Sequence, residues 1–155
     1  GIGGNLNTGR VGNAGFGTQT AAVSAGGFPS YSAVEEYNGS SWTSVTSLPV
    51  PVDSAGTCGT LTQGLLFGGQ TPGGSNTNTT VHYNGTSWSP VGTLNTTRRH
   101  LLGAGTQTAG LAFGGRAPAI TGATELYDGS SWTEVNDLNT ARQQLGRAGT
   151  QTAAL

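Results

Sequence analysis

The sequence predicts an all-β fold made of tandem units of about 44 residues, each of them a four-stranded antiparallel sheet. Three features predict it: anchors that recur at fixed spacing, tight-turn signals inside each unit, and no apolar period of 3.6 residues long enough for a helix. Leucine opens each unit, at Leu6, Leu48, Leu94 and Leu138. A glycine pair follows 20 residues after each of the first three leucines, at Gly26 and Gly27, Gly68 and Gly69, and Gly114 and Gly115.

A hairpin signal marks the last two strands of each unit. Tyr is followed by Asn-Gly or Asp-Gly, then by two hydroxyl residues and Trp. The three pairs are Tyr37 and Trp42, Tyr83 and Trp88, and Tyr127 and Trp132. Asn-Gly and Asp-Gly favour a type I′ turn, because both central residues of that turn need positive φ. One strand should therefore end at the Tyr, and the next should begin at the Trp.

A second turn signal, Gly-Thr-x-Thr, marks the first two strands, at residues 17–20, 59–62, 105–108 and 149–152. In the third unit the four strands are expected at about residues 98–104, 109–114, 122–127 and 131–135. Four short strands in each repeat, with Gly and aromatic signatures, are typical of a β-propeller blade. A β-solenoid with two rungs in each unit is the competing fold, but its rungs do not need a tight Asn-Gly hairpin before each Trp.

The leucine anchors also set the predicted boundaries. Residues 1–5 are a linker, residues 6–47, 48–93 and 94–137 are blades 1, 2 and 3, and residues 138–155 are the first strands of a fourth blade. Propellers typically contain four to eight blades. We therefore expect the chain to be a fragment of a longer protein, with further blades or further copies needed to close the ring of sheets.

The order of these anchors resembles the kelch repeat over residues 6–155: a Gly pair ends the second strand, then come a Tyr, a Trp, a Leu and an Arg. The segments Leu94-Asn95-Thr96 and Leu138-Asn139-Thr140-Ala141-Arg142 are also similar to kelch-like arrays in tail-fibre and structural proteins of marine bacteriophages. The resemblance implies a β-propeller with a structural or adhesive role. Blade 2 departs from the pattern, because residues 49–53 read Pro-Val-Pro-Val-Asp.

The composition argues against several classes of partner. Charged residues make up 8% of the chain, Lys is absent and the formal net charge is −1, so the basic surface of a nucleic-acid-binding protein is missing. No apolar run approaches the roughly 18 residues of a membrane span. The single Cys58 cannot form an intrachain disulfide, and we expect it to be a buried, unreactive thiol.

The two faces of the predicted blades differ in their sequence variation. The Gly-Thr-x-Thr and Asn-Gly turns repeat almost unchanged on one face, whereas the loops 28–31, 70–80 and 116–121 on the other face vary in length and composition. Variable loops on a rigid repeat are where binding usually occurs. The candidate binding residues on that face are Arg10, Arg98, Arg99, His100, Arg116 and Arg142.

Each candidate also has a structural alternative. Arg10, Arg98 and Arg142 recur four residues after a leucine, so they could instead satisfy backbone carbonyls of the neighbouring blade. Arg99, His100 and Arg116 break the repeat, which favours a ligand for them more strongly. The recurring Tyr and Trp residues could stack on sugars, but an identical place in every unit favours packing between adjacent sheets, and the paired glycines are expected to be structural too.

No constellation for catalysis is recognisable. His82 and His100 lie on different predicted strands and blades, and the spacing of His, Cys and acidic residues matches no metal site or cofactor site. Copper-radical oxidases share this kind of propeller, but no matching ligand motif is present. We expect a non-enzymatic structural or adhesion protein of a virion or the extracellular space, which binds a host surface glycan or another virion protein. The alternatives are a secreted carbohydrate-active enzyme and a protein–protein adaptor.

Overall fold

The computed structural model describes residues 3–144, 146 and 149–154, and these residues form strands and loops with no helix. Blade 1 contains β1 (Ala14–Thr18), β2 (Ala21–Ala25), β3 (Val34–Tyr37) and β4 (Trp42–Ser44). Blade 2 contains β5 (Gly56–Thr60), β6 (Gln63–Phe67), β7 (Thr80–Tyr83) and β8 (Trp88–Val91). Blade 3 contains β9 (Leu102–Gly105), β10 (Gly110–Phe113), β11 (Thr124–Tyr127) and β12 (Trp132–Val135). A smaller sheet pairs β13 (Gly149–Thr150) with β14 (Ala153–Ala154).

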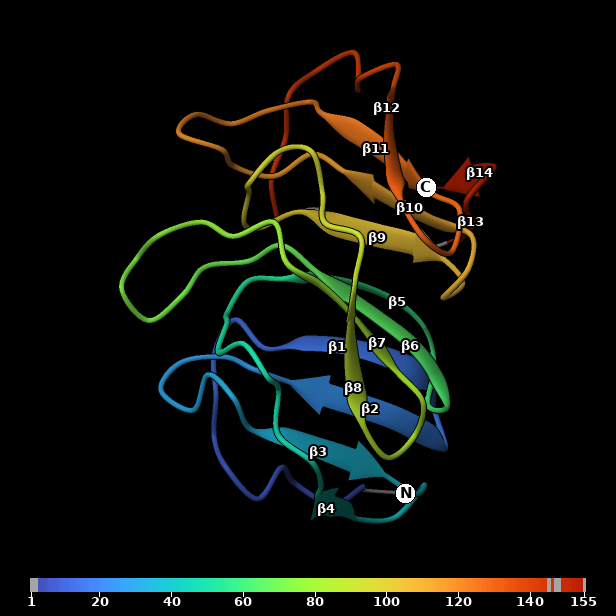
Figure 1. Ribbon diagram of the computed structural model, residues 1–155. Helices are drawn as coiled ribbons and strands as arrows, with labels where there is room; N and C mark the ends of the chain where they lie inside the picture. The colour runs from blue at the N-terminus through green and yellow to red at the C-terminus, as the bar shows by residue number, and fades with distance from the viewer. Residues whose placement is uncertain (1–2, 145, 147–148, 155) are drawn as a thin grey trace.

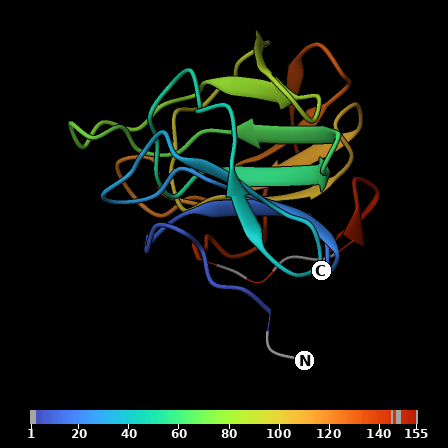
Figure 2. The same ribbon diagram turned by 90° about the horizontal axis from the view of Figure 1, so that it is seen from below.

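The strands of each blade are antiparallel and lie in sequence order across the sheet. The three sheets stack in turn, and their first strands, β1, β5 and β9, are neighbours in space (Figure 1). The variable loops gather on one side of the molecule in both views, and the Gly-Thr-x-Thr turns lie on the opposite side (Figures 1 and 2). The predicted all-β fold of four-stranded, propeller-like blades is confirmed, and the described residues form no closed ring of sheets.

The first strand of blade 3 begins at Leu102, although the sequence suggested a start near residue 98. The cause lies in the backbone. Arg99 forms an isolated β-bridge with Arg116, and His100 has a φ of 53°, which interrupts the extended conformation before Leu102.

Two of the three repeated Trp side chains, Trp88 and Trp132, pack between adjacent blades. Trp132 lies 4.9 Å from Phe67, measured between ring centroids, and its indole N–H donates a 3.1 Å hydrogen bond to Oγ1 of Thr80 in the preceding blade. Trp88 donates in the same direction, to the carbonyl oxygen of Thr46 at 3.1 Å. The contacts explain why an indole recurs at this position, since it fills and ties the junction of two sheets.

Two further contacts recur at these junctions. The hydroxyl of Tyr83 donates to Glu36 at 2.7 Å, and the hydroxyl of Tyr127 lies 3.0 Å from Nε2 of His82. The side-chain amide of Gln107, in the Gly-Thr-Gln-Thr turn, donates to the carbonyls of Gly64 and Tyr83 in the preceding blade, both at 2.9 Å. At the junction of blades 1 and 2, Leu61 stands in place of this glutamine and packs against the apolar cluster instead.

The paired glycines bring the second strand of one blade against the next blade. Gly69 donates its N–H to the carbonyl of Arg98 at 2.9 Å, and a Cβ on Gly68 would lie 2.7 Å from that same oxygen. Both glycines have positive φ, at 63° and 105°. A side chain is therefore excluded by both space and backbone conformation. None of the described residues lies in a helix with the length and apolarity that membrane crossing requires.

Candidate binding site

The variable positions converge on a strip of backbone beside the first strands, which we call the rim. It is built from β-bridges that recur in each blade: Val11 with Phe28, Asp53 with Gln70, and Arg99 with Arg116. Each bridge has two N–H···O=C hydrogen bonds, with N···O distances between 2.7 and 3.1 Å. The backbone of the rim is therefore the same in all three blades, whereas its side chains change from apolar to acidic and polar, and then to basic.

A chain of backbone hydrogen bonds also joins the blades at the rim. The residue after the first partner of each bridge has a left-handed conformation: Gly12 (68°), Ser54 (53°) and His100 (53°), and Gln144 (56°) has it at the same repeat position after Leu138. Its N–H donates to the carbonyl of the same residue in the preceding blade, at 2.7, 2.8 and 3.2 Å. Non-glycine residues rarely adopt this conformation, and such strain is frequent at functional sites. The hydrogen-bonded chain holds these side chains side by side.

The apolar part of the rim is unusually open to solvent. Val11 is 67% exposed and Phe28 is 55% exposed, and they are two of the four most exposed large apolar residues described. The ring of Phe28 packs against Tyr31 at its edge, with 6.0 Å between the ring centroids. An exposed aromatic ring held by a β-bridge offers a flat apolar surface to solvent.

The basic part of the rim is braced by the long loop of blade 2. The side-chain oxygen of Asn76 accepts a 3.3 Å hydrogen bond from the Arg99 guanidinium, and its amide nitrogen donates to the carbonyl of Arg116 at 3.0 Å. Neither guanidinium forms an ion pair with a described carboxylate. Two cations on directly opposed residues repel each other, so an anionic or strongly hydrogen-bonding ligand would relieve an unfavourable interaction.

His100 lies between these regions and is half-buried. Its pKa is lowered from the usual value, first by burial and then by the positive charge of Arg99, with Arg116 acting in the same direction and Asp53 opposing it. The imidazole is accordingly neutral at neutral pH and can both donate and accept hydrogen bonds.

A cavity of about 280 Å³ opens among these residues. It is lined by Val11, Gly12, Phe28, Asp53, Ser54, His100 and Gln144. The lining combines an aromatic ring, a carboxylate, an imidazole and hydroxyl and amide groups. A few polar groups around an apolar wall are the usual make-up of a small-molecule pocket.

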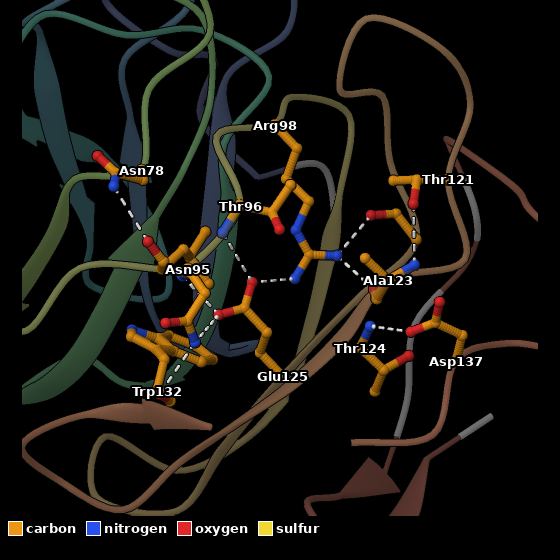
Figure 3. A network of polar contacts seen from close by, with 12 residues as sticks. Asn78, Asn95, Thr96, Arg98, Thr121, Ala123, Thr124, Glu125, Trp132 and Asp137 are labelled. Carbon is orange, nitrogen blue, oxygen red and sulfur yellow. Dashed lines mark hydrogen bonds and ion pairs between the residues drawn. The ribbon is translucent and has the colours of Figure 1, made fainter. Parts of the chain in front are cut away.

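Arg10 and Arg98 lie below the rim and face inward. The guanidinium of Arg98 is completely buried and donates to the carbonyls of Gly114 and Ala123 and to Glu125, the last at 3.0 Å (Figure 3). Arg10 contacts the carbonyls of Gly26 and Ala33 and Glu35 in the same manner. The carbonyls belong to the arginine's own blade and not, as the structural alternative supposed, to the neighbouring one. The structural interpretation is favoured for both arginines.

Each buried glutamate is held from a second side. Glu125 accepts hydrogen bonds from the backbone N–H groups of Asn95 and Thr96, at 2.7 and 3.4 Å, while the Asn95 side chain reaches the carbonyl of Trp132 at 3.0 Å (Figure 3). Buried charges are tolerated only when they are paired and hydrogen-bonded. The Leu-Asn-Thr-x-Arg motif therefore binds a glutamate on the third strand of the blade, through its arginine side chain and its backbone N–H groups.

Blade 2 replaces this whole unit with apolar residues. Val52 stands at the arginine position and Val81 at the glutamate position, and both are 2% exposed within one apolar cluster. Pro49, which has no N–H to donate, stands at the asparagine position. The departure seen in residues 49–53 is thus a coupled replacement that leaves no buried charge unpaired.

Arg142 differs from its two counterparts. It belongs to a third copy of the Leu-Asn-Thr-x-Arg motif, but its side chain is exposed and makes no ion pair with a described carboxylate. Its backbone carbonyl accepts a 2.7 Å hydrogen bond from Gly115, as the pattern requires.

The chemistry available elsewhere is limited. No group of three or more His, Cys, Asp or Glu residues able to hold a metal ion occurs in the described part of the chain. Cys58 is buried, and burial lowers the pKa of His82 beside the Tyr127 hydroxyl.

The structure brings Arg99, His100 and Arg116 together, and it separates them from the inward-facing Arg10 and Arg98. Sequence reasoning placed Phe28 and Gln70 in the variable loops of this face but did not name them as candidate residues, and it missed Val11 and Asp53. The available signal was positional: each lies five residues after a leucine or directly after a glycine pair. Comparison with protein-family models and with curated proteins finds no match to this chain.

Proposed function

We propose that this chain is a kelch-like propeller segment of a virion or extracellular structural protein, and that its rim binds a surface glycan without catalysing a reaction. The observation that carries the proposal is the rim itself. Three backbone-equivalent bridges present Val11 and Phe28, Asp53 and Gln70, and Arg99 and Arg116 on the same side of the molecule. A constant backbone with changing side chains is the pattern expected of a recognition surface on a repeat scaffold.

A glycan suits this surface for two chemical reasons. The exposed ring of Phe28 offers a flat apolar face, and the polar groups around the 280 Å³ cavity include donors and acceptors for hydroxyls. The guanidinium groups of Arg99 and Arg116 can accept a carboxylate or stack on a sugar ring. Contact with another virion protein remains the alternative occupant, and hydrolysis of a polysaccharide is the alternative of a different class.

The proposal is tested by binding to immobilised glycans, using Phe28→Ala and Arg116→Ala separately and together. Both side chains are exposed and make no hydrogen bond with other described residues, so the variants should keep their melting temperature. The expected result is a loss of glycan binding of about tenfold or more in the double variant. The control is Glu134→Gln, which changes a charge on the outermost strand β12, far from the rim along the sheet.

Unchanged glycan binding in the double variant, or binding only to other virion proteins, would contradict the proposal. Release of oligosaccharide from a polysaccharide that the chain binds would replace it with the enzymatic alternative.

A further inference from the structure

Arg99 and Arg116 differ from the arginines that hold the blades together. The guanidinium of Arg98 donates to two carbonyls and a carboxylate, and that of Arg10 donates to two carbonyls, a hydroxyl and a carboxylate. Among the described residues, the Arg99 guanidinium has a single hydrogen-bond acceptor, the side-chain oxygen of Asn76 at 3.3 Å, and the exposed Arg116 side chain has none. Most N–H donors of these two groups are therefore not used by the described part of the chain.

The β-bridge places the two arginines directly opposite each other. The backbone N–H of Arg99 donates to the carbonyl of Arg116 at 3.0 Å, and the reverse hydrogen bond is 2.7 Å long. Directly opposed residues of an antiparallel pair project their side chains from the same face. Guanidinium groups stay charged in proteins, and neither one forms an ion pair with a described carboxylate. The site therefore carries an excess of positive charge.

This excess charge reaches the adjacent imidazole. Burial lowers the pKa of His100 most, and the positive charges of Arg99 and Arg116 lower it further, whereas Asp53 acts in the opposite direction. Asp53 is thus close enough to act on His100, yet it forms no ion pair with a described arginine. The carboxylate of the rim does not neutralise the arginine pair.

A carboxylate or a sulfate ester matches this pair better than a hydroxyl does. Its oxygens can accept two parallel hydrogen bonds from a guanidinium fork, and such charge-assisted bonds are about twice as strong as neutral ones. Asn76, from the long loop of blade 2, holds the Arg99 fork in place, so less side-chain freedom is lost when an anion binds. A sugar hydroxyl would leave both charges uncompensated. The pair should therefore distinguish acidic sugars from neutral ones.

We propose that the rim selects acidic glycans, and that Arg99 and Arg116 bind the carboxylate or sulfate group of one sugar residue. The inference rests on the glycan binding proposed above and adds its chemical class. The apolar end of the rim, at Phe28, serves neutral and acidic chains alike, because it offers only an uncharged ring face. The charge of the glycan is recognised at the Arg99–Arg116 end.

The test compares each acidic glycan with its own neutral form. The probes are immobilised oligouronates and sulfated oligogalactans, each beside the same chain after carboxyl reduction or desulfation. The protein should bind at least one acidic probe, and its neutral form at least about tenfold more weakly, because hydrogen bonds to a charged group are lost. Added salt should weaken binding of the acidic probe and leave that of the neutral form nearly unchanged. The two series separate carboxylates from sulfate esters as the source of the anion.

Variants of the chain then locate the preference. Arg116→Gln should reduce the preference for the acidic probe by about tenfold. Arg116→Glu should abolish it, because the new carboxylate faces Arg99 and neutralises the site from within. This variant should keep or raise the melting temperature, since opposite charges on directly opposed residues attract each other.

Two further variants are controls. Thr133→Glu makes the same change in net charge as Arg116→Gln, at an exposed position of the outermost strand β12, and should leave the preference within about twofold. Phe28→Ala should weaken binding of the acidic and neutral forms by the same factor, because it removes the contact that both share.

The outcomes separate this inference from glycan binding as such. Equal binding of acidic and neutral forms, reduced by Phe28→Ala, would refute the anion site and leave glycan binding at the rim standing. A preference that survives Arg116→Glu would refute the site as well, and an equal loss in Thr133→Glu would assign the preference to net charge. Binding to no member of either series would contradict both proposals.

Discussion

Arg98 has no solvent exposure, and its guanidinium is spread over two carbonyls and Glu125. Desolvation of such a pair costs nearly as much as the attraction returns, but removal of one partner leaves a buried charge alone. Blade 2 shows how the chain avoids that cost without the pair, since Val52 and Val81 occupy both positions. The ion pair can therefore be replaced by two apolar residues together, whereas replacement of only one partner leaves a buried charge unpaired.

The corresponding prediction concerns stability. Arg98→Val and Glu125→Val alone should each lower the free energy of unfolding by about 3–5 kcal/mol, and the double variant should lose less than either single one. Urea denaturation measures the three values, and the coupling follows from the double-mutant cycle. A double variant whose loss equals the sum of the two single losses would show that the pair does not act as a unit.

His100 provides a prediction on pH dependence. Its folded-state pKa is lowered by burial and by Arg99, so protonation favours the unfolded chain. The stabilisation of the folded chain by neutral His100 is present above the pKa of His100 in the unfolded chain, and it is lost as the pH falls through the pKa of His100 in the folded chain. The melting temperature should therefore decrease between about pH 7.5 and about pH 5, and by a smaller amount in His100→Asn, because Asn tolerates the left-handed backbone. Equal decreases in both proteins would show that His100 does not titrate with folding.

At the scale of elements, the outermost strand of each blade is protected from pairing with other chains. β4 has only three residues, β8 contains Pro90, and β12 carries the exposed Glu134. Short length, proline and charge are the devices that natural sheets use at their edges. The apolar junctions lie instead between the blades, where the Trp side chains are.

The Trp junction therefore carries a large share of the stability. Trp132→Ala should lower the free energy of unfolding by about 3–5 kcal/mol, the range for a buried aromatic side chain. Trp88→Ala should cost less, because Trp88 is only half-buried. Thermal or urea unfolding gives both values. A Trp132→Ala chain with unchanged stability would mean that the indole is not part of the junction.

The elements also show how far the sequence could predict the structure. Tyr-Asn-Gly and Gly-Thr-x-Thr predicted the hairpins because their turn residues act locally. The start of β9 was missed, since the left-handed conformation of His100 depends on a hydrogen bond to Ser54 in another blade. For the same reason Val11 and Phe28 gave no signal as partners: a bridge between residues 17 positions apart is set by tertiary packing.

At the scale of the whole molecule, the repeat brings chemically different side chains to equivalent places on a shared backbone. The chain of hydrogen bonds through Gly12, Ser54 and His100 sets their order along the rim. Arg99 and Arg116 were expected together from the way they break the repeat, whereas the inward orientation of Arg98 needed the partners Gly114 and Glu125 to be known. The binding proposal depends on stacking of the units in blade register.

NMR coupling across hydrogen bonds tests this stacking most directly. In isotope-labelled protein the account predicts couplings from the amide of Ser54 to the carbonyl of Gly12 and from the amide of His100 to the carbonyl of Ser54, which join residues in successive blades. A β-solenoid would show a different result: the strands of successive units would be coupled to each other along their lengths, and the couplings among Gly12, Ser54 and His100 would be missing. That pattern would contradict the blade arrangement and, with it, the rim.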